Sequence, residues 1–368
     1  MARKPEGKLK RGWTTGACAT AATKAAYTAL LTNQFPDPVT ITLPKGEQPA
    51  FALCREEKPD NTNDNTAMAA IVKDAGDDPD VTHQATIVSR VRLGLPGSGI
   101  VFHAGEGVGM VTKPGLPIPA GEPAINPVPR QMMSEVIAEV AQDHGGAGDV
   151  IIEISIPDGE ELALKTWNPR LGILGGLSIL GTTGVVVPFS CSSWIHSIHR
   201  GIDVAIATGR THVSGCTGST SEKAVMQFYG LEEGDMLDMG DFAGGMLKYL
   251  RDHPVPRLTI GGGFGKLTKL AMGHLDLHSG RSQVDMSWLA DRLKELKAPP
   301  EVIKEAKTAN TANQILVRCL KERIPIAEKI AALAQQEALK VLRGQTEVEV
   351  IIIDRPGKII ARSSVAKE

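Results

Sequence analysis

The sequence predicts an α/β protein of two domains, and three observations lead to this fold class. The chain has 368 residues, which exceeds one domain of roughly 100–200 residues. Hydrophobic residues make up 42% of it and charged residues 22%, so a large core can be buried. Strand-like and helix-like segments alternate along its length. We expect an α+β N-terminal domain with a mixed sheet over residues 1–165, and a C-terminal domain with βα units and a helical tail over residues 166–368.

The first domain is expected to open with an Ala-rich helix, for which Thr14 or Thr15 is suited as the N-cap. Alternating or β-branched runs predict strands over residues 39–43, 51–54, 69–72, 86–93 and 150–156. A helix is expected over residues 130–143, and it ends at the glycine-rich residues 144–148. The polar residues 55–65 predict a surface loop.

In the second domain, short apolar segments followed by glycines predict parallel βα units. Residues 184–187 and 203–207 are expected as short buried strands, and residues 219–229 as a helix. Residues 258–260 predict a strand that enters a glycine turn and then a helix through Met272. Further helices are expected within about 284–343, over residues 284–297, 301–308 and 326–343. Residues 348–353 predict a closing strand, turned into a hairpin by residues 355–358.

Charge, aromatic content and cysteine usage exclude several classes of protein. Lys and Arg total 40 against 42 acidic residues, and only 4% of residues are aromatic, which disfavours nucleic-acid binding. Residues 171–199 carry no Asp, Glu, Lys or Arg, but glycines and polar residues break the run too often for a membrane span. The five cysteines form no C-x-x-C pair, so neither a disulfide framework nor a zinc site is expected. We expect a soluble, cytoplasmic protein that binds no nucleic acid and no membrane.

Two glycine-containing turns at helix starts could bind an anion. Thr14, Thr15 and Gly16 open the first helix, where free amides attract negative groups. Gly261, Gly262, Gly263 and Gly265, followed by Lys266, form the second turn; their spacing matches neither a dinucleotide fingerprint nor a phosphate-binding P-loop. At each turn, a purely structural role is the alternative.

Acidic residues supply two more candidates. Asp74, Asp77 and Asp78, with Asp80 nearby, could hold a cation or ribose hydroxyls, or form a solvated turn. Glu106, in a glycine-dense loop, could act as a base or be a surface residue of a tight hairpin. Histidine pairs at helical spacing lack a third ligand, so no metal site is predicted.

Several motifs distributed over most of the chain resemble the CbiD family of cobalamin-biosynthesis proteins. They are residues 11–19 (RGWTTGACA), 73–83 (KDAGDDPDVTH), 105–109 (GEGVG), 112–116 (TKPGL), 124–130 (AINPVPR), 168–173 (NPRLGI), 178–184 (SILGTTG), 265–271 (GKLTKLA) and 278–279 (HS). Residues 208–221 and 262–264 depart from the pattern of the family.

The resemblance implies a two-domain α/β protein that transfers a methyl group from S-adenosylmethionine to C1 of cobalt-precorrin-5B, giving cobalt-precorrin-6A. A tetrapyrrole rim rich in carboxylates calls for Arg, Lys and helix N-termini. The substrate-binding candidates are Lys113, Arg130, Arg170 and Lys266, together with Thr14, Thr15 and Gly16.

For the cationic methyl donor, the resemblance makes Asp74, Asp77 and Asp78 candidates, as well as the glycines at 261, 262, 263 and 265. Glu106 and His278 are the candidate bases if a ring proton must leave. A homo-oligomeric state is compatible with the sequence.

Alternatives remain at this point. The strand, glycine turn and helix near residue 261 would also suit an NADPH-dependent precorrin reductase, although the dinucleotide fingerprint is missing. A non-enzymatic tetrapyrrole carrier would bind the substrate without needing a methyl donor. A homologue that acts on a metal-free ring is a third alternative.

Overall fold

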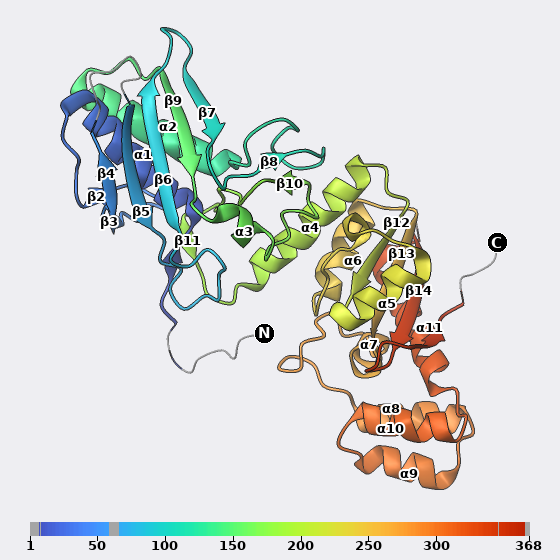
Figure 1. Ribbon diagram of the computed structural model, residues 1–368. Helices are drawn as coiled ribbons and strands as arrows, with labels where there is room; N and C mark the ends of the chain where they lie inside the picture. The colour runs from blue at the N-terminus through green and yellow to red at the C-terminus, as the bar shows by residue number, and fades with distance from the viewer. Residues whose placement is uncertain (1–6, 8, 59–65, 345, 365–368) are drawn as a thin grey trace. The chain divides into compact units, whose positions relative to one another are not determined.

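The computed structural model describes residue 7 and residues 9–58, 66–344 and 346–364. The chain divides into two compact units, Met1–Ser190 and Cys191–Glu368 (Figure 1). Each unit combines helices with its own sheet, which confirms the α/β fold class. The surface loop predicted over residues 55–65 begins with a short strand, β4 (Arg55–Glu57), and residues 59–65 lie outside the described part of the chain.

The first unit is built on a mixed sheet with the strand order β4-β5-β6-β9-β7. These strands are β5 (Thr66–Val72), β6 (Thr86–Leu93), β7 (Ile100–Ala104) and β9 (Val150–Ser155). Neighbouring strands are antiparallel, except that β7 runs parallel to β9. Strand β7 lies in a glycine- and proline-rich segment for which the sequence predicted no strand.

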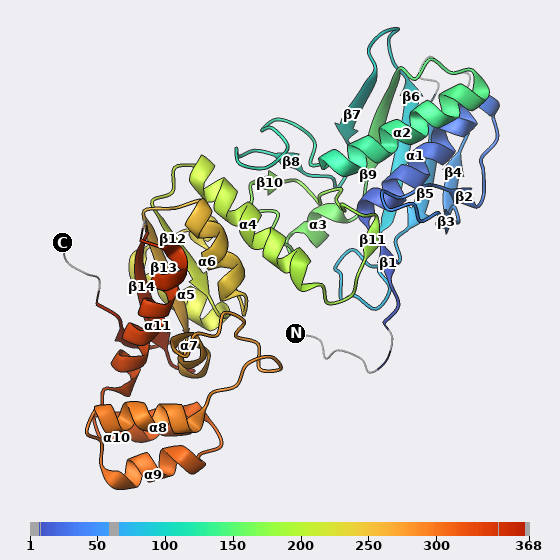
Figure 2. The same cartoon turned by 180° about the vertical axis from the view of Figure 1, so that it is seen from behind.

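Two long helices, α1 (Thr15–Thr32) and α2 (Pro127–His144), cover one face of this sheet (Figures 1 and 2). Alanines of α1 pack on small residues of β5 such as Ala67 and Ala69, and Thr23 hydrogen-bonds to Ser89 of β6 inside the core. Small side chains let the helix approach the sheet closely, and the alanine-rich composition that predicted the helix also explains its burial.

Residues 166–190 belong to the first unit. Strand β10 (Ile173–Leu174) pairs with β8 (Met110–Val111), and β11 (Val185–Val186) pairs with β1 (Gly12–Trp13). The sequence placed this segment in the second domain, because the rhythm of the predicted elements changes after residues 168–170. The remaining elements of the unit are β2 (Val39–Thr40), β3 (Ala50–Phe51) and α3 (Gly159–Ala163).

The second unit contains a sheet with the order β12-β13-β14-β15. Strands β12 (His212–Cys216), β13 (Arg257–Gly263) and β14 (Glu347–Ile353) are parallel, and β15 (Ile359–Arg362) returns antiparallel at one edge. At the other edge, Ser214 of β12 forms a bridge with Met236. These findings confirm the predicted strand, glycine turn and helix near residue 261, the closing strand and its hairpin. The strand predicted over residues 184–187 is β11, which lies in the first unit, is half-buried and pairs antiparallel with β1.

Some helices of this unit pack on the sheet, and the others precede it or lie between α7 and β14. They are α4 (Cys191–Ala207), α5 (Ser219–Tyr229), η1 (Glu233–Asp235), α6 (Ala243–Asp252), α7 (Phe264–Ala271), α8 (Met286–Glu295), α9 (Pro300–Thr308), α10 (Ala312–Lys321) and α11 (Ile326–Leu342). The strand predicted over residues 203–207 is wrong, because these residues form the last turn of α4. Ile198, Ile202 and Ala205 repeat at helical spacing on its buried face.

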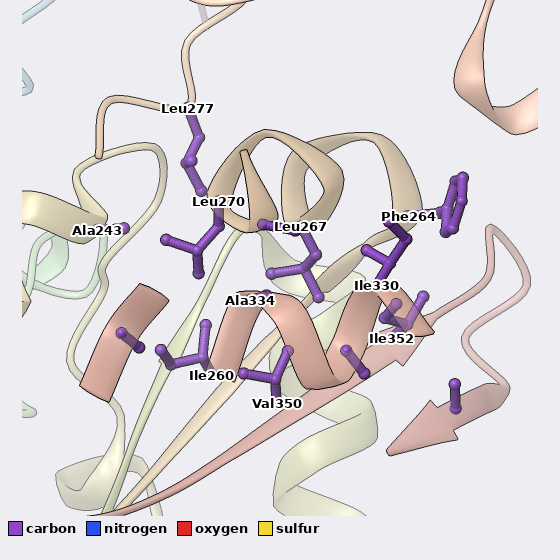
Figure 3. Close-up of a cluster of buried hydrophobic side chains, with 14 of the residues drawn as sticks. Ala243, Ile260, Phe264, Leu267, Leu270, Leu277, Ile330, Ala334, Val350 and Ile352 are labelled. Carbon is purple, nitrogen blue, oxygen red and sulfur yellow. The ribbon is translucent and has the colours of Figure 1, made fainter. Parts of the chain in front are cut away.

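Helices α5 and α7 lie on opposite faces of the second sheet. Leu267 and Leu270 of α7 share one core with Val350 and Ile352 of β14, as Figure 3 shows. Val225 of α5 packs instead with the residues of β14 that point the other way, Ile351 and Ile353. Since consecutive strand residues face opposite sides, the two helices leave neighbouring strands toward opposite faces.

No helix in the described residues combines the length and the apolar composition needed to cross a bilayer. All five cysteines are free thiols.

Candidate functional site

The glycine turn that the sequence singled out lies at the carboxyl end of the parallel sheet of the second unit. Cys216 at the end of β12 is level with Gly261 of β13, and the Thr217 amide donates to the Gly261 carbonyl at 2.9 Å. A side chain at Gly262 would collide with Thr217, since a Cβ there would lie 2.8 Å from its Oγ1. A Cβ at Gly261 would lie 2.8 Å from Sγ of Cys216, so both glycines allow the strands and turns to pack closely.

The starts of α5 and α7 are both open. Gly218 and Gly263 are their N-caps, and no side chain caps either helix. A Cβ added at Gly218, Gly263 or Gly265 would meet no atom within 4 Å. Within the described residues, the amides of residues 219–221, 265 and 266 have no acceptor, whereas Phe264 continues the ladder between β13 and β14. Such amides carry the positive end of the helix dipole and can bind an anion.

Lys266 lies beside these helix starts. Its Nζ donates to the Thr217 carbonyl at 2.9 Å and lies 2.8 Å from Oδ1 of Asp241. Asp241 is held there by its neighbour, because the Gly240 amide donates to the Cys216 carbonyl at the end of β12. Lys269, one turn further along α7, donates to the Leu277 carbonyl, and burial lowers the pKa of its ammonium group.

The start of α1 has a different arrangement. Thr14 is the N-cap, as predicted, and its Oγ1 accepts from the Ala17 amide at 3.2 Å. The Gly16 amide donates to the Leu180 carbonyl, and the Thr15 hydroxyl accepts from the Leu180 amide. Both threonines are buried. The chain itself satisfies these groups, so this helix start offers an anion no free amide at Gly16 or Ala17.

The acidic residues 74–80 form hydrogen bonds within the first unit. Asp74 accepts from the Gly76 amide and from Lys10 Nζ, and Asp77 accepts from the Lys10 amide. Asp78 accepts from the Phe189 amide at 2.7 Å. Through these hydrogen bonds, the three carboxylates fix the segment before β1 and the segment at Phe189. The residues predicted to bind the cofactor therefore have a structural role in the first unit. Lys10 also keeps the pKa of Asp74 below its ordinary value.

Two substrate-binding candidates of the first unit, Lys113 and Arg170, come from one region, which we call the β8–β10 region (residues 105–126 and 168–180). Thr112 hydrogen-bonds to the Gly172 carbonyl, so Lys113 lies beside the segment that contains Arg170. The Lys113 stem packs against Gly172, and its ammonium has no acceptor within the described residues. Arg130 donates to the Ile125 carbonyl and pairs with Glu122.

Glu106 projects from the same region. It is exposed, and the turn that carries it is fixed by three glycines whose backbones touch. A Cβ at Gly107 would lie 2.0 Å from the Ile156 carbonyl, and Cβ atoms at Gly159 and Gly176 would both meet the Gly107 carbonyl. The other candidate base, His278, is an exposed residue of the second unit whose Nδ1 accepts from the Gly280 amide. The two candidates thus belong to different units.

The histidine pairs form no metal site in the described residues, where no three His, Cys, Asp or Glu side chains cluster. His199 instead stacks on Tyr249, with ring centroids 4.0 Å apart.

Sequence reasoning missed Asp241 and Thr217. Neither lies in a recognisable motif, and only the fold brings them to Lys266. The one available signal was Thr217 itself, which precedes a glycine and a run of Ser and Thr residues suited to a helix start.

Comparisons with known proteins cover both units. A model of the CbiD family matches residues 2–188, and a model of the CbiD C-terminal domain matches residues 276–364. A protein of Paramagnetospirillum magneticum named cobalt-precorrin-5B C(1)-methyltransferase is 59% identical over 356 residues, covering 96% of this chain and 98% of its own. A protein of Brucella anthropi with the same name is 60% identical over 358 residues, covering 97% of this chain and 96% of its own.

A crystal structure of the cobalamin biosynthesis protein CbiD from Archaeoglobus fulgidus matches with a TM-score of 0.40 and 27% identity, over 70% of this chain and 78% of that one. The family models and the nearly full-length relatives agree with the motifs found in the sequence. This chain belongs to the CbiD family.

Proposed function

We propose that this chain is an S-adenosylmethionine-dependent methyltransferase that methylates C1 of cobalt-precorrin-5B in cobalamin biosynthesis. The observation that carries the proposal is the 59–60% identity, over nearly the whole chain, to relatives named for this reaction. The matched residues include both units of this chain and nearly the whole length of each relative, so the proposal concerns both units.

Methyl transfer from this donor requires the protein to position the two reactants more than to activate them. When bound, the donor supplies an electrophilic methyl group, which C1 takes with its own electron pair while the pair of the broken S–C bond stays on sulfur. The protein then has to bind both reactants and align them, and good alignment can supply roughly 7–11 kcal/mol of the barrier.

The residues proposed for this task differ between the units. Lys113 and Arg170 of the β8–β10 region are proposed to bind carboxylates of the tetrapyrrole, with Arg130 supporting the loop between them. The glycine turn that ends at Gly265 is proposed to bind the donor, because its helix start is open and its backbone can be approached. The Asp74, Asp77 and Asp78 carboxylates are each satisfied internally, so the donor proposal rests on the glycines.

Glu106 and His278 are proposed as alternative bases for removing a ring proton. Both side chains are exposed, which permits access by a large substrate. The test compares Glu106→Gln and His278→Ala with the parent protein at saturating substrate. A base role requires at least about a hundredfold loss of kcat in one variant. If both variants retain turnover, neither residue is the base.

The decisive experiment incubates the protein anaerobically with methyl-labelled S-adenosylmethionine and cobalt-precorrin-5B, and then locates the label. Label at C1 supports the proposal. Tetrapyrrole that binds but gains no label would favour a carrier or a reductase instead, and NADPH would then be the ligand to test. A cytoplasmic location is part of the proposal, because free cysteines are usual in a reducing compartment.

A further inference from the structure

We propose that the first unit pairs with a second copy of this chain through the outer side of strand β7, Ile100–Ala104, which we call the β7 edge. In the pair, the two β7 strands run antiparallel about a two-fold axis at Phe102, so that the sheets of both first units form one continuous sheet. The inference concerns an interaction surface and does not depend on the reaction that the protein catalyses.

The position of β7 gives the first argument. It is the last strand of the first sheet, and within the described residues it pairs with β9 alone (Figure 1). The Gly105 amide donates to the Ile154 carbonyl of β9, so the odd-numbered residues of this stretch point toward β9. The amides and carbonyls of Ile100, Phe102 and Ala104 therefore point away from the sheet. In the part of the chain that the structure describes, they have no hydrogen-bond partner.

The composition of β7 gives the second argument. Edge strands of natural proteins are usually protected by charged side chains, by proline or by a β-bulge. Strand β7 reads IVFHA, with no Lys, Arg, Asp, Glu or Pro, and its pairing with β9 shows no register shift. The edge strand of the second sheet, β15, has both a register shift, opposite Ile352 and Ile353, and a charged residue, Arg362. The β7 edge is thus suited to pairing with another strand.

The order of the residues in β7 fits a second copy of the same strand. In an antiparallel pair centred on Phe102, this residue exchanges two hydrogen bonds with Phe102 of the second copy, and Ile100 does so with Ala104. Every outward amide and carbonyl then has a partner. The large Ile100 faces the small Ala104, and on the other face Val101 lies opposite His103, so no like charges meet.

Exposed leucines beside β7 are a third and independent observation. Leu93 at the end of β6 is 52% exposed, and Leu95 in the turn that leads to β7 is 80% exposed. Asp149 fixes this turn, because its carboxylate accepts from the Gly97 amide at 2.9 Å and from the Gly99 amide at 2.7 Å. The turn therefore presents apolar surface next to the β7 edge, and a second copy would remove part of that surface from water.

The same register brings the second copy close to Glu106. Because Ala104 pairs with Ile100 of the second copy, the residues that follow β7, Gly105 and Glu106, lie beside the end of the second copy's turn at residues 94–99. Each copy thus contributes to the surroundings of the exposed carboxylate in the other one.

The test is sedimentation velocity of the full chain between about 1 and 100 μM. Val101→Lys combined with His103→Lys places like charges opposite each other across the axis. The matched control, Val101→Glu combined with His103→Lys, places opposite charges there. In both variants the new lysine lies across from Glu153 of β9, which suits the fold of the single chain. A third variant, Ala104→Pro, removes an outward amide and puts a ring where the second strand would lie.

The parent protein should sediment as a dimer whose population grows with concentration. The double-lysine variant should raise the dissociation constant by at least about tenfold, because like charges oppose each other twice. The glutamate–lysine variant should associate at least as tightly as the parent protein, and Ala104→Pro should be monomeric. Circular dichroism spectra and urea midpoints should match those of the parent protein, which separates lost pairing from lost folding.

Three results would overturn the inference. One is a parent protein that stays monomeric over the whole concentration range. Another is a dimer with the same dissociation constant in the parent protein and all three variants, because the copies would then meet through another surface. The last is equal association of the double-lysine and the glutamate–lysine variants, which would refute the antiparallel register about Phe102.

Discussion

Lys73 and Asp80 form an ion pair in the first unit, with Nζ 2.7 Å from Oδ2 and only 1% of the lysine side chain exposed. The same aspartate accepts hydrogen bonds from the amide and the hydroxyl of Thr82. Burial alone would raise the pKa of the Asp80 carboxyl, but Lys73 and Thr82 outweigh it and hold that pKa below its ordinary value. The acidic run therefore contains a buried charge that needs its partner.

Replacing Asp80 with Asn should destabilise the protein by about 3 kcal/mol or more, because it leaves the Lys73 ammonium buried without a counter-charge. Urea unfolding followed by circular dichroism measures the change. Asp291→Asn is the control: Asp291 pairs with Lys294 on an exposed helix surface, so its loss should change stability by less than about 0.5 kcal/mol. Equal effects of the two substitutions would contradict a stabilising role of the buried pair.

The same pair predicts a loss of stability in acid. Because the pKa of Asp80 is lower in the folded protein than in the unfolded chain, its contribution is complete above the unfolded value of about 4. It is lost as the pH falls through the folded value. The free energy of unfolding of the parent protein should thus fall more steeply below about pH 4 than that of Asp80→Asn. Parallel curves for the two proteins would show that Asp80 does not titrate in this way.

His212 predicts a second pH effect, near neutrality. Burial and the nearby Arg257 guanidinium lower its pKa, and its Nε2 lies 2.8 Å from the Thr259 hydroxyl. The folded protein therefore binds a proton here less readily than the unfolded chain, whose histidine titrates at about 6.5. Stability should decrease as the pH falls below about 6.5. His212→Gln keeps a hydrogen-bonding side chain that does not titrate. The free energy of unfolding of this variant, measured with urea between about pH 5 and 7, should therefore decrease less as the pH falls. An unchanged slope would contradict the role of His212.

Gly107 should tolerate no side chain. An alanine there would have both a positive φ of 70° and a Cβ 2.0 Å from the Ile156 carbonyl. We expect Gly107→Ala to lose at least about 3 kcal/mol of unfolding free energy. Gly121 is the matched control, with a φ of 92° and open space, and its alanine variant should lose only about 1–2 kcal/mol. Because both variants have a strained φ, the difference between their free energies of unfolding measures the cost of the clash with the Ile156 carbonyl.

Replacing Lys113 should weaken substrate binding and leave the stability of the protein unchanged. Its ammonium lies without an acceptor in the described residues, so Lys113→Ala should leave unfolding unchanged and raise KM for the tetrapyrrole by about tenfold. Lys294→Ala, on an exposed helix, should change neither quantity. A parent-like KM for Lys113→Ala would remove this residue from the proposed substrate site.

Local patterns predicted the elements whose signals are local. The helix over residues 219–229 and the strand before the glycine turn are present as expected, because flanking glycines and apolar periodicity mark them. The strand predicted over residues 203–207 was wrong, because a short apolar run can belong either to a strand or to the last turn of a helix. The pairing of β10 with β8 joins residues about sixty positions apart, which no local pattern encodes.

The candidate site was predictable only in part for the same reason. The glycines in the sequence predicted that backbone segments approach one another closely. The sequence does not show at which helix start other parts of the chain accept hydrogen bonds from the first amides. That difference depends on Leu180, which reaches the start of α1 from far along the chain. Asp241 reaches Lys266 only through the turn after η1.

The borders of the second sheet bear on self-association. One border is the strand β15, which has only four residues, and at the other border the segment after η1 donates to the Ser214 and Cys216 carbonyls of β12. Long borders of unpaired backbone groups recruit strands from other molecules and begin aggregation, whereas short or covered borders resist it. Concentrated samples of this protein should therefore form few intermolecular β-structures through the second sheet.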